Sequence, residues 1–266
     1  MHHRARKRFG QNFLVDSGVI ARIVDVISPQ PGDVLIEIGP GQAAMTRPLA
    51  ESGAEMVLLE IDRDLVARLR EQFAGYASVS VHEGDALREN FDELAGHRRF
   101  RLVGNLPYNI STPLIFHALR WSAQTRDMHF MLQQEVVNRL AASPGCKAWG
   151  RLSIMCQLRC AVTPLFDVPP GAFSPAPKVN SSVVRLVPHA NPPVEVDDPE
   201  IFEQVVRQAF SQRRKTLRNS LRSLLDAPTM EAGGIDPGAR PETRGLVELA
   251  AMSRVLAEQK RWLRTQ

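Results

Sequence analysis

Hydrophobic and polar residues along the first half of the chain follow two alternating patterns. Short apolar runs, typical of buried β-strands, are found at residues 33–39, 55–61, 79–82, 100–104 and 127–132. Before, between and after them, apolar residues recur at helical spacing, at residues 17–28, 43–52, 63–74, 112–121 and 134–142. Strands that alternate with helices predict an α/β fold, in which a mostly parallel sheet carries helices on both faces.

The pattern changes in the second half of the chain. We predict two further strands, at residues 152–162 and 181–187, separated by a proline-rich stretch at 164–177. Residues 188–199 have the composition of a linker, and residues 200–266 contain only helix and loop signals. The sequence therefore predicts a larger α/β domain at 1–189 and a small helical domain at 190–266.

A glycine motif stands where the first strand turns into a helix. Gly39, Gly41 and Ala44 fit the spacing G-x-G-x-x-A, in which glycine lets the backbone approach a nucleotide closely. Glu60 ends the second strand and Asp85 follows the third. Ligands of open α/β sheets bind beyond the carboxyl ends of the strands. We therefore predict one adenosine site, with Glu60 on the ribose hydroxyls and Asp85 on the adenine amine. A nicotinamide cofactor and S-adenosylmethionine both fit at this point.

The fourth strand ends in the motif Asn105-Leu106-Pro107-Tyr108. An amine conjugated to a ring is a poor nucleophile until its nitrogen becomes tetrahedral. The Asn105 side-chain oxygen and the Leu106 carbonyl, held in place by the rigid Pro107, can accept both N–H groups and favour that geometry in the transition state. Tyr108 offers a flat face for stacking. The motif favours methyl transfer from S-adenosylmethionine over a nicotinamide-dependent oxidoreductase, which would have no use for it.

Composition limits the other possibilities. The 266 residues are 44% hydrophobic, as in globular proteins, and no apolar run reaches the ~18 residues of a membrane-spanning helix. The basic start is not followed by the apolar segment of a secretion signal. The three cysteines lack a metal-ligand pattern, which predicts reduced thiols in a cytoplasmic protein and no metal site.

The net charge of +4 is unevenly distributed. An N-terminal arm contains Arg4, Arg6, Lys7 and Arg8, and a second basic cluster contains Arg207, Arg213, Arg214, Lys215, Arg218 and Arg222. Neither stretch, 1–10 or 207–222, contains an acidic residue. Two such clusters predict a polyanionic partner, while a solvated helix face is the alternative interpretation.

Several motifs occur in an order that resembles the ribosomal RNA adenine dimethylase family. They are Gln11-Asn12-Phe13-Leu14, Glu37-Ile38-Gly39-Pro40-Gly41, Glu60-Ile61-Asp62, Gly84-Asp85, Asn105-Leu106-Pro107-Tyr108-Asn109-Ile110-Ser111-Thr112 and Phe173-Ser174-Pro175-Ala176-Pro177-Lys178-Val179. The resemblance covers nearly the whole chain. The segment 210–219 resembles the bacterial small-subunit branch of the family, and we do not expect it in the related erythromycin-resistance methylases of 23S rRNA.

The resemblance implies a class I methyltransferase domain followed by an rRNA-binding helical domain. It implies N6,N6-dimethylation of two adjacent adenosines in the 3′-terminal hairpin loop of 16S rRNA, within the maturing small ribosomal subunit. Asn12 and Leu14 would close over the cofactor, and Asn105 would contact both the cofactor and the target amine. Phe173 would form a second stacking face opposite Tyr108.

Two further expectations follow. A non-catalytic RNA-binding relative built on the same fold is the alternative from another class of protein, and the intact Asn105 and Tyr108 argue against it. We expect a monomer, because nothing in the sequence indicates a dimer seam.

Overall fold

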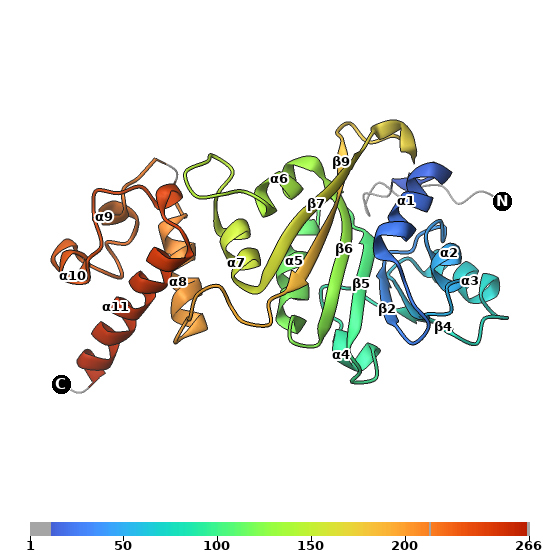
Figure 1. Cartoon of the computed structure of the whole chain (residues 1–266), viewed down its shortest axis with the longest axis horizontal. Helices are drawn as coiled ribbons and strands as arrows, with labels where there is room; N and C mark the ends of the chain where they lie inside the picture. The colour runs from blue at the N-terminus through green and yellow to red at the C-terminus, as the bar shows by residue number, and fades with distance from the viewer. Residues whose placement is uncertain (1–11, 213, 265–266) are drawn as a thin grey trace. The chain divides into compact units, whose positions relative to one another are not determined.

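The computed structural model describes residues 12–212 and 214–264 (Figure 1). Contacts divide the chain into two compact units, residues 1–137 with 160–188 and residues 138–159 with 189–266. The chain passes from the first unit to the second for the last time between Pro188 and His189, next to the boundary that the sequence predicts between residues 189 and 190. Residues 138–159 group with the second unit, however, and not with the first as the sequence predicted.

A seven-stranded sheet forms the centre of the first unit. Its order is β4 (Val79–Glu83), β3 (Glu55–Glu60), β2 (Val34–Ile38), β5 (Phe100–Asn105), β6 (Thr125–Gln133), β9 (Ser181–Pro188) and β7 (Cys160–Val168). The first five strands are parallel, and β9 runs antiparallel to both β6 and β7. The five predicted parallel strands and the strand at 181–187 are therefore confirmed.

The predicted strand at 152–162 is wrong. Residues Arg151–Arg159 form helix α7, and strand β7 begins only at Cys160. The run Leu152–Cys156 is buried throughout, so its apolar character does not distinguish a helix from a strand. Strand β7 also continues through Pro164, which the sequence analysis placed in a loop. A proline is tolerated there because β7 is an edge strand with an irregular register at Pro164.

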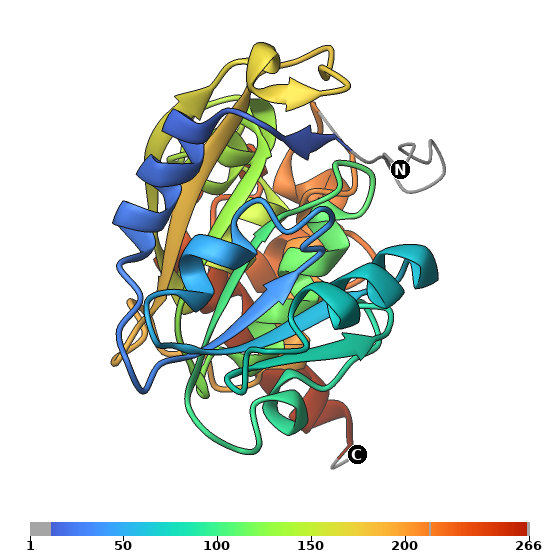
Figure 2. The ribbon, with the colours of Figure 1, turned by 90° about the vertical axis from the view of Figure 1, so that its right-hand side faces the viewer.

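Helices precede, connect and follow the parallel strands. They are α1 (Ser17–Ile27), α2 (Thr46–Ala50), α3 (Arg63–Gln72), α4 (Phe91–Leu94), α5 (Ser111–Ala118) with the 3₁₀ turn η2 (Leu119–Trp121), and α6 (Gln134–Leu140). Asp16 caps α1 and Asp62 caps α3, each through its side-chain carboxylate. Helix α2 starts later than the predicted residue 43, because Ala43 has a left-handed φ of 65°. Figure 2 shows α1 and α5 on opposite sides of the strands.

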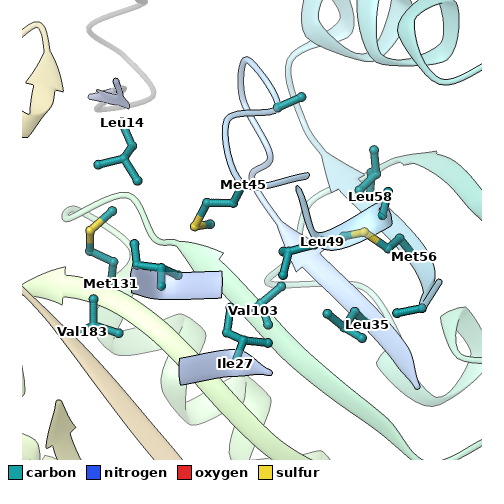
Figure 3. Packing of buried hydrophobic residues seen from close by; sticks show 14 of the residues in the cluster. Leu14, Ile27, Leu35, Met45, Leu49, Met56, Leu58, Val103, Met131 and Val183 are labelled. Atoms are coloured by element: carbon teal, nitrogen blue, oxygen red, sulfur yellow. The ribbon is translucent and has the colours of Figure 1, made fainter. Parts of the chain in front are cut away.

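The hydrophobic core lies between the sheet and the helices of one face. Leu35, Val103, Met131 and Val183 project from four neighbouring strands into the same cluster, as Figure 3 shows. Helices contribute Ile23 and Ile27 from α1, Leu49 from α2 and Leu69 from α3, and Phe73, the residue after α3, joins them. This packing holds the strand ends rigidly, which a site built from several strand ends requires.

A second, two-stranded sheet closes over one end of this core. Strand β1 (Phe13–Leu14) pairs antiparallel with β8 (Phe173–Ser174), which follows the 3₁₀ turn η3 (Pro170–Ala172). The amides of Val15 and Asp16 both donate to the Ala172 carbonyl. The start of the described chain is thereby fixed to a segment almost 160 residues further on.

The second unit is helical in the described residues, as the sequence predicted for 200–266. It contains α7, α8 (Pro199–Ala209), α9 (Leu217–Ser220), α10 (Ala227–Ala232), the 3₁₀ turn η4 (Pro241–Thr243) and α11 (Leu246–Arg264). Helix α8 places Phe202, Val205 and Val206 in the interior. The indole of Trp149 donates to the Arg244 carbonyl at 2.9 Å.

Candidate functional site

A cavity of about 270 Å³ opens at the carboxyl ends of β2, β3, β4 and β5, and β1 covers part of it. Its lining includes Asn12, Leu14, Gly39, Gly41, Glu60, Asp85, Asn105, Leu106, Pro107 and Tyr108. The structure thus brings together every predicted cofactor residue and the four residues of the strand-end motif. Convergence follows from the parallel sheet, because its carboxyl ends all meet at one edge.

The glycine loop after β2 needs glycine for two different reasons. Gly39 and Gly41 have φ angles of 65° and 58°, in the region that side chains disfavour. A Cβ atom on Gly41 would also lie 3.1 Å from two ring carbons of Phe13, so the ring of β1 covers this glycine. At Gly39 an added Cβ would meet no atom within 4 Å, which leaves the backbone accessible to a ligand.

Glu60 is a buried carboxylate held by main-chain amides. One oxygen accepts from Ile61 and Asp62, both at 3.0 Å, and the other accepts from Gly41 at 3.2 Å. Burial raises the pKa of Glu60, and these amide hydrogen bonds oppose that effect. A carboxylate has about four acceptor positions, so these three bonds leave capacity for a ligand hydroxyl.

Glu37, the last acid of β2 before the glycine loop, is a site residue that the sequence analysis did not assign. Its side chain is 1% exposed and lines the cavity, and neither carboxylate oxygen has a hydrogen-bond partner among the described residues. Burial, opposed by the nearby Thr46 hydroxyl and assisted by the charge of Glu60, raises the pKa of Glu37 to about 7. The sequence signal that could have identified Glu37 is an acidic residue near the end of a strand that is otherwise apolar and fully buried.

Asp85 follows β4, as predicted. One of its oxygens accepts from the Leu87 amide at 3.0 Å, and the other lies 3.7 Å from Arg88. The side chain is only partly buried, and the neighbouring Gly84, Ala86 and Leu87 also line the cavity. Asp85 therefore combines a fixed orientation with access to the cavity.

Asn105 ends β5 and faces the same cavity. Its side-chain Nδ2 donates to the Asn12 carbonyl at 3.0 Å. The Leu106 amide donates to the Met131 carbonyl, and the Ile110 amide donates to Pro107, which closes a turn over the motif. The preceding residue, Gly104, leaves little room for a side chain, because a Cβ atom there would lie 2.6 Å from the Ile38 carbonyl oxygen.

Tyr108 is half-buried at the edge of the cavity. Its hydroxyl lies 2.6 Å from the Ser181 hydroxyl at the start of β9, and its carbonyl accepts from Ser111. Burial raises the pKa of the Tyr108 phenol, and the hydrogen bond to Ser181 opposes that effect. Tyr108 was predicted from its motif and Ser181 was not, since no pattern in the chain links two residues so far apart.

Phe173 does not reach the cavity in this structure. Its side chain is 4% exposed and belongs to the core cluster, and it pairs across the small sheet with Leu14. Leu14 both lines the cavity and belongs to that cluster. The second stacking face inferred from the family resemblance is therefore buried against the core.

The structure describes only some of the predicted RNA-binding basic residues. Arg4, Arg6, Lys7, Arg8 and Arg213 lie outside the described residues. Arg207, Arg214, Lys215, Arg218 and Arg222 are exposed on the second unit, and none pairs with a described carboxylate within 4.0 Å. Their exposure is what a polyanion-binding cluster requires.

Three further properties concern the described ranges, 12–212 and 214–264. No helix there is long and apolar enough to cross a membrane. No group of three or more histidine, cysteine, aspartate or glutamate residues in those ranges is arranged to hold a metal ion. None of the three cysteines forms a disulfide bond with another described residue, and Cys156 and Cys160 are buried.

The sheet order and the convergence of the glycine loop, Glu60, Asp85 and Asn105 define a class I S-adenosylmethionine-dependent methyltransferase fold and site. The sequence matches the family described as Ribosomal RNA adenine dimethylase over residues 2–244. It is 55% identical to the Ribosomal RNA small subunit methyltransferase A of Pseudomonas fluorescens, over 97% of this chain and 96% of that protein. The Pseudomonas aeruginosa protein of the same name is 54% identical over 96% of each chain. The chain therefore belongs to the ribosomal RNA adenine dimethylase family.

Two crystal structures resemble this one in fold. A dimethyladenosine transferase from Plasmodium falciparum aligns over 94% of this chain and 98% of its own, with a TM-score of 0.78 and 23% identity. The 23S rRNA methyltransferase ErmE aligns over 93% of this chain and 99% of its own, with a TM-score of 0.69 and 25% identity. The first likeness supports the fold alone.

Proposed function

We propose that this chain transfers methyl groups from S-adenosylmethionine to the N6 amines of two adjacent adenosines in the 3′-terminal hairpin loop of 16S rRNA. The substrate would be the maturing small ribosomal subunit in the cytoplasm. Family membership supports adenine dimethylation, and the names of the relatives with 53–55% identity support the small subunit. The observation that carries the proposal is the position of Asn105 in the same cavity as Glu37, Glu60 and Asp85.

The cavity suits S-adenosylmethionine in the chemistry of its lining. The unpartnered carboxylate of Glu37 suits a cationic ligand, and the open space beside Gly39 suits close contact with the backbone. Glu60 would accept from the ribose hydroxyls, and Asp85 would accept from the adenine amine. Asn12 and Leu14 would cover the bound cofactor from β1. The cofactor would supply an electrophilic methyl group beside Asn105.

The remaining chemistry belongs to the target amine. The Asn105 side-chain oxygen would accept one N–H of the target, and the Leu106 carbonyl would accept the other. Both acceptors favour a tetrahedral, positively charged nitrogen over the planar ground state, so they stabilise the transition state selectively. Tyr108 would stack on the target base after it leaves its helical stack. No strong base is required, because the alkylated amine is acidic.

The second unit would hold the RNA. Arg207, Arg213, Arg214, Lys215, Arg218 and Arg222, with the N-terminal arm, would contact phosphates outside the cavity. Phe173 would act as a second stacking face only if β1 and β8 separate, because Leu14 pairs with it in this structure. We predict that the protein acts as a monomer and that its activity persists in a metal chelator.

A methyl-transfer assay tests the proposed function. Small-subunit particles that lack the modification and, in a parallel reaction, large-subunit particles would be incubated with the protein and radiolabelled S-adenosylmethionine, followed by nucleoside analysis. The expected product is N6,N6-dimethyladenosine in 16S rRNA. Label confined to large-subunit particles would instead support a 23S rRNA methylase, and no label in either particle would support a non-catalytic RNA-binding protein.

A further inference from the structure

The hydroxyl groups of Tyr108 and Ser181 form a short hydrogen bond at 2.6 Å. Ser181 is completely buried and is the first residue of β9, where its backbone is in register with Gln133 on one side and Val168 on the other. Two strands therefore fix the position of the Ser181 side chain. Tyr108, by contrast, lies on the turn that follows β5.

The backbone of that turn is fixed, but the ring needs a separate restraint. Ser111 donates to the Tyr108 carbonyl and Ile110 donates to Pro107, and both bonds involve main-chain atoms of the turn. A tyrosine ring rotates about two side-chain torsions, and ordering it costs free energy each time a base stacks on it. A hydrogen bond from a rigid strand to the far end of the ring removes that freedom in advance.

We propose that Ser181 is a positioning residue that holds the Tyr108 ring as a preformed stacking face for the target base. The inference rests on the proposed function, in which Tyr108 contacts the adenine. Ser181 acts through Tyr108 and contacts neither the cofactor nor the amine. The hydrogen bond also links the turn after β5 to the first residue of β9. The position of β9 in the sheet therefore determines the position of the Tyr108 ring at the edge of the cavity.

The next residue provides a matched control. Ser182 is also buried on β9, but its hydroxyl donates to Asp167, whose other oxygen accepts from Gln134. Successive residues of a strand point to opposite faces. Ser181→Ala and Ser182→Ala therefore remove the same atom from the same strand, and only the first removes the partner of Tyr108.

The first test is kinetic. We expect Ser181→Ala to lower kcat/KM for the RNA by about 3- to 10-fold, the effect of one hydrogen bond, mainly through a higher KM. KM for S-adenosylmethionine and the melting temperature should match those of Ser182→Ala. Equal RNA kinetics in the two variants would overturn the proposal.

The second test does not depend on catalysis. Tyr76 and Tyr108 are the only tyrosines in the sequence, so a Tyr76→Phe background isolates the phenol of Tyr108 in an ultraviolet pH titration. The Ser181 hydroxyl lowers the pKa of Tyr108 in the native protein, so Ser181→Ala should raise it, whereas Ser182→Ala should leave it unchanged. An unchanged titration in Ser181→Ala would show that the two hydroxyls do not interact in solution.

A double-mutant cycle completes the design. Tyr108→Phe removes the hydroxyl and keeps the ring, so it should lower kcat/KM to the same extent as Ser181→Ala, and the double variant should lose no more than either single one. Additive losses would refute the coupling. If the wild-type protein methylates no RNA, the proposed function fails, while the titration still decides whether Ser181 positions Tyr108.

Discussion

The side-chain amide nitrogen of Asn105 donates to the main-chain carbonyl of Asn12, 93 residues earlier, at 3.0 Å. This bond uses the donor end of the amide and leaves its oxygen as the acceptor for an amine. The segment that covers the cofactor cavity therefore also orients the residue that would polarise the target nitrogen. The position of the β1 segment over the cavity and the orientation of the Asn105 side chain therefore depend on the same hydrogen bond.

Asn105→Ala should abolish most turnover while cofactor binding stays largely intact. In the proposed mechanism the side-chain oxygen acts mainly in the transition state, and the loss of one such polar contact lowers kcat by about 100- to 1000-fold. Isothermal calorimetry with S-adenosylmethionine and single-turnover methylation would separate the two effects. Asn138→Ala, an exposed position on the second unit, is the control. Normal turnover in Asn105→Ala would refute the polarising role.

The raised pKa of Glu37 makes stability fall as pH rises. Since the pKa is about 7 in the folded protein and 4.5 in the unfolded chain, the folded state binds the proton more tightly, and the penalty develops between pH 4.5 and 7. Glu37→Gln should therefore unfold like wild type near pH 4.5 and be more stable at pH 8, by an amount on the order of 3 kcal/mol.

Urea unfolding at pH 5 and pH 8 measures this difference, and Glu51→Gln, an exposed position, serves as its control. Saturating S-adenosylmethionine should reduce the gain at pH 8, because its positive charge stabilises the Glu37 carboxylate. A gain that does not vary with pH would contradict the assignment.

Asp127 should have the opposite pH dependence. Burial alone would raise its pKa, but the nearby His129 ring, whose Nδ1 lies 3.6 Å from the carboxylate, and the hydrogen-bonded Arg101 guanidinium outweigh burial and hold the pKa at about 2. The ionised Asp127 carboxylate contributes fully to the free energy of unfolding above pH 3.8, and this contribution is lost as the pH falls through about 2.

Asp127→Asn leaves Arg101, a 4% exposed residue, with Asp33 as its remaining carboxylate partner. We expect a loss of about 3–5 kcal/mol in the free energy of unfolding at pH 7. Chemical denaturation checks this, with the exposed Asp25→Asn as the reference. A loss below about 1 kcal/mol would mean that water or Asp33 compensates.

Gly104→Ala should damage both stability and cofactor binding. The new methyl group would lie 2.6 Å from the Ile38 carbonyl oxygen, so β2 and β5 must separate just below the glycine loop. Overpacking of this kind costs about 1–3 kcal/mol. Gly75→Ala, where an added Cβ meets no atom within 4 Å, is the matched control, and calorimetry with S-adenosylmethionine gives the affinity. Equal affinities in the two variants would contradict the prediction.

Arg213→Ala combined with Arg214→Ala should weaken RNA binding and make it less sensitive to salt. Each lost phosphate contact reduces the slope of log affinity against log salt by about 0.7–0.9. Fluorescence anisotropy with the 3′-terminal RNA hairpin at several salt concentrations would measure the slope. The pair Arg68→Ala and Arg70→Ala removes the same charge from exposed positions on α3. An equal change of slope in the Arg68 and Arg70 pair would show that the cluster at residues 207–222 has no specific part in RNA binding.

The cofactor side of the site could be predicted from the sequence because it is local. Gly39, Glu60 and Asn105 each stand at the end of a buried apolar run, Asp85 follows the more exposed strand β4, and a parallel sheet gathers such positions at one edge. Glu37 was overlooked because it lies inside such a run, where an acid is easily read as part of the strand.

The base side was less predictable because its contacts are distant in sequence. Tyr108 contacts Ser181 only because β9 lies beside the end of β6, and Phe173 contacts Leu14 only because β8 pairs with β1. Both β8 and β9 come late in the chain. The sequence assigned Phe173 to stacking by resemblance, while its burial depends on pairing of β8 with β1. Helix α7 was mistaken for a strand for a local reason, since both its burial and its length suit either element.

The insertion of β9 between β6 and β7 sets the order in which the site can be completed during synthesis. All strands from β2 to β6 have been made when residue 133 emerges, so the cofactor half of the sheet has its partners early. Strand β7 has no neighbour in the sheet until residues 181–188 follow, and β1 waits for residues 173–174. A growing chain thus has the strand ends that would hold the methyl donor well before it gains the partners that fix β1 over the cavity and Tyr108 at its edge.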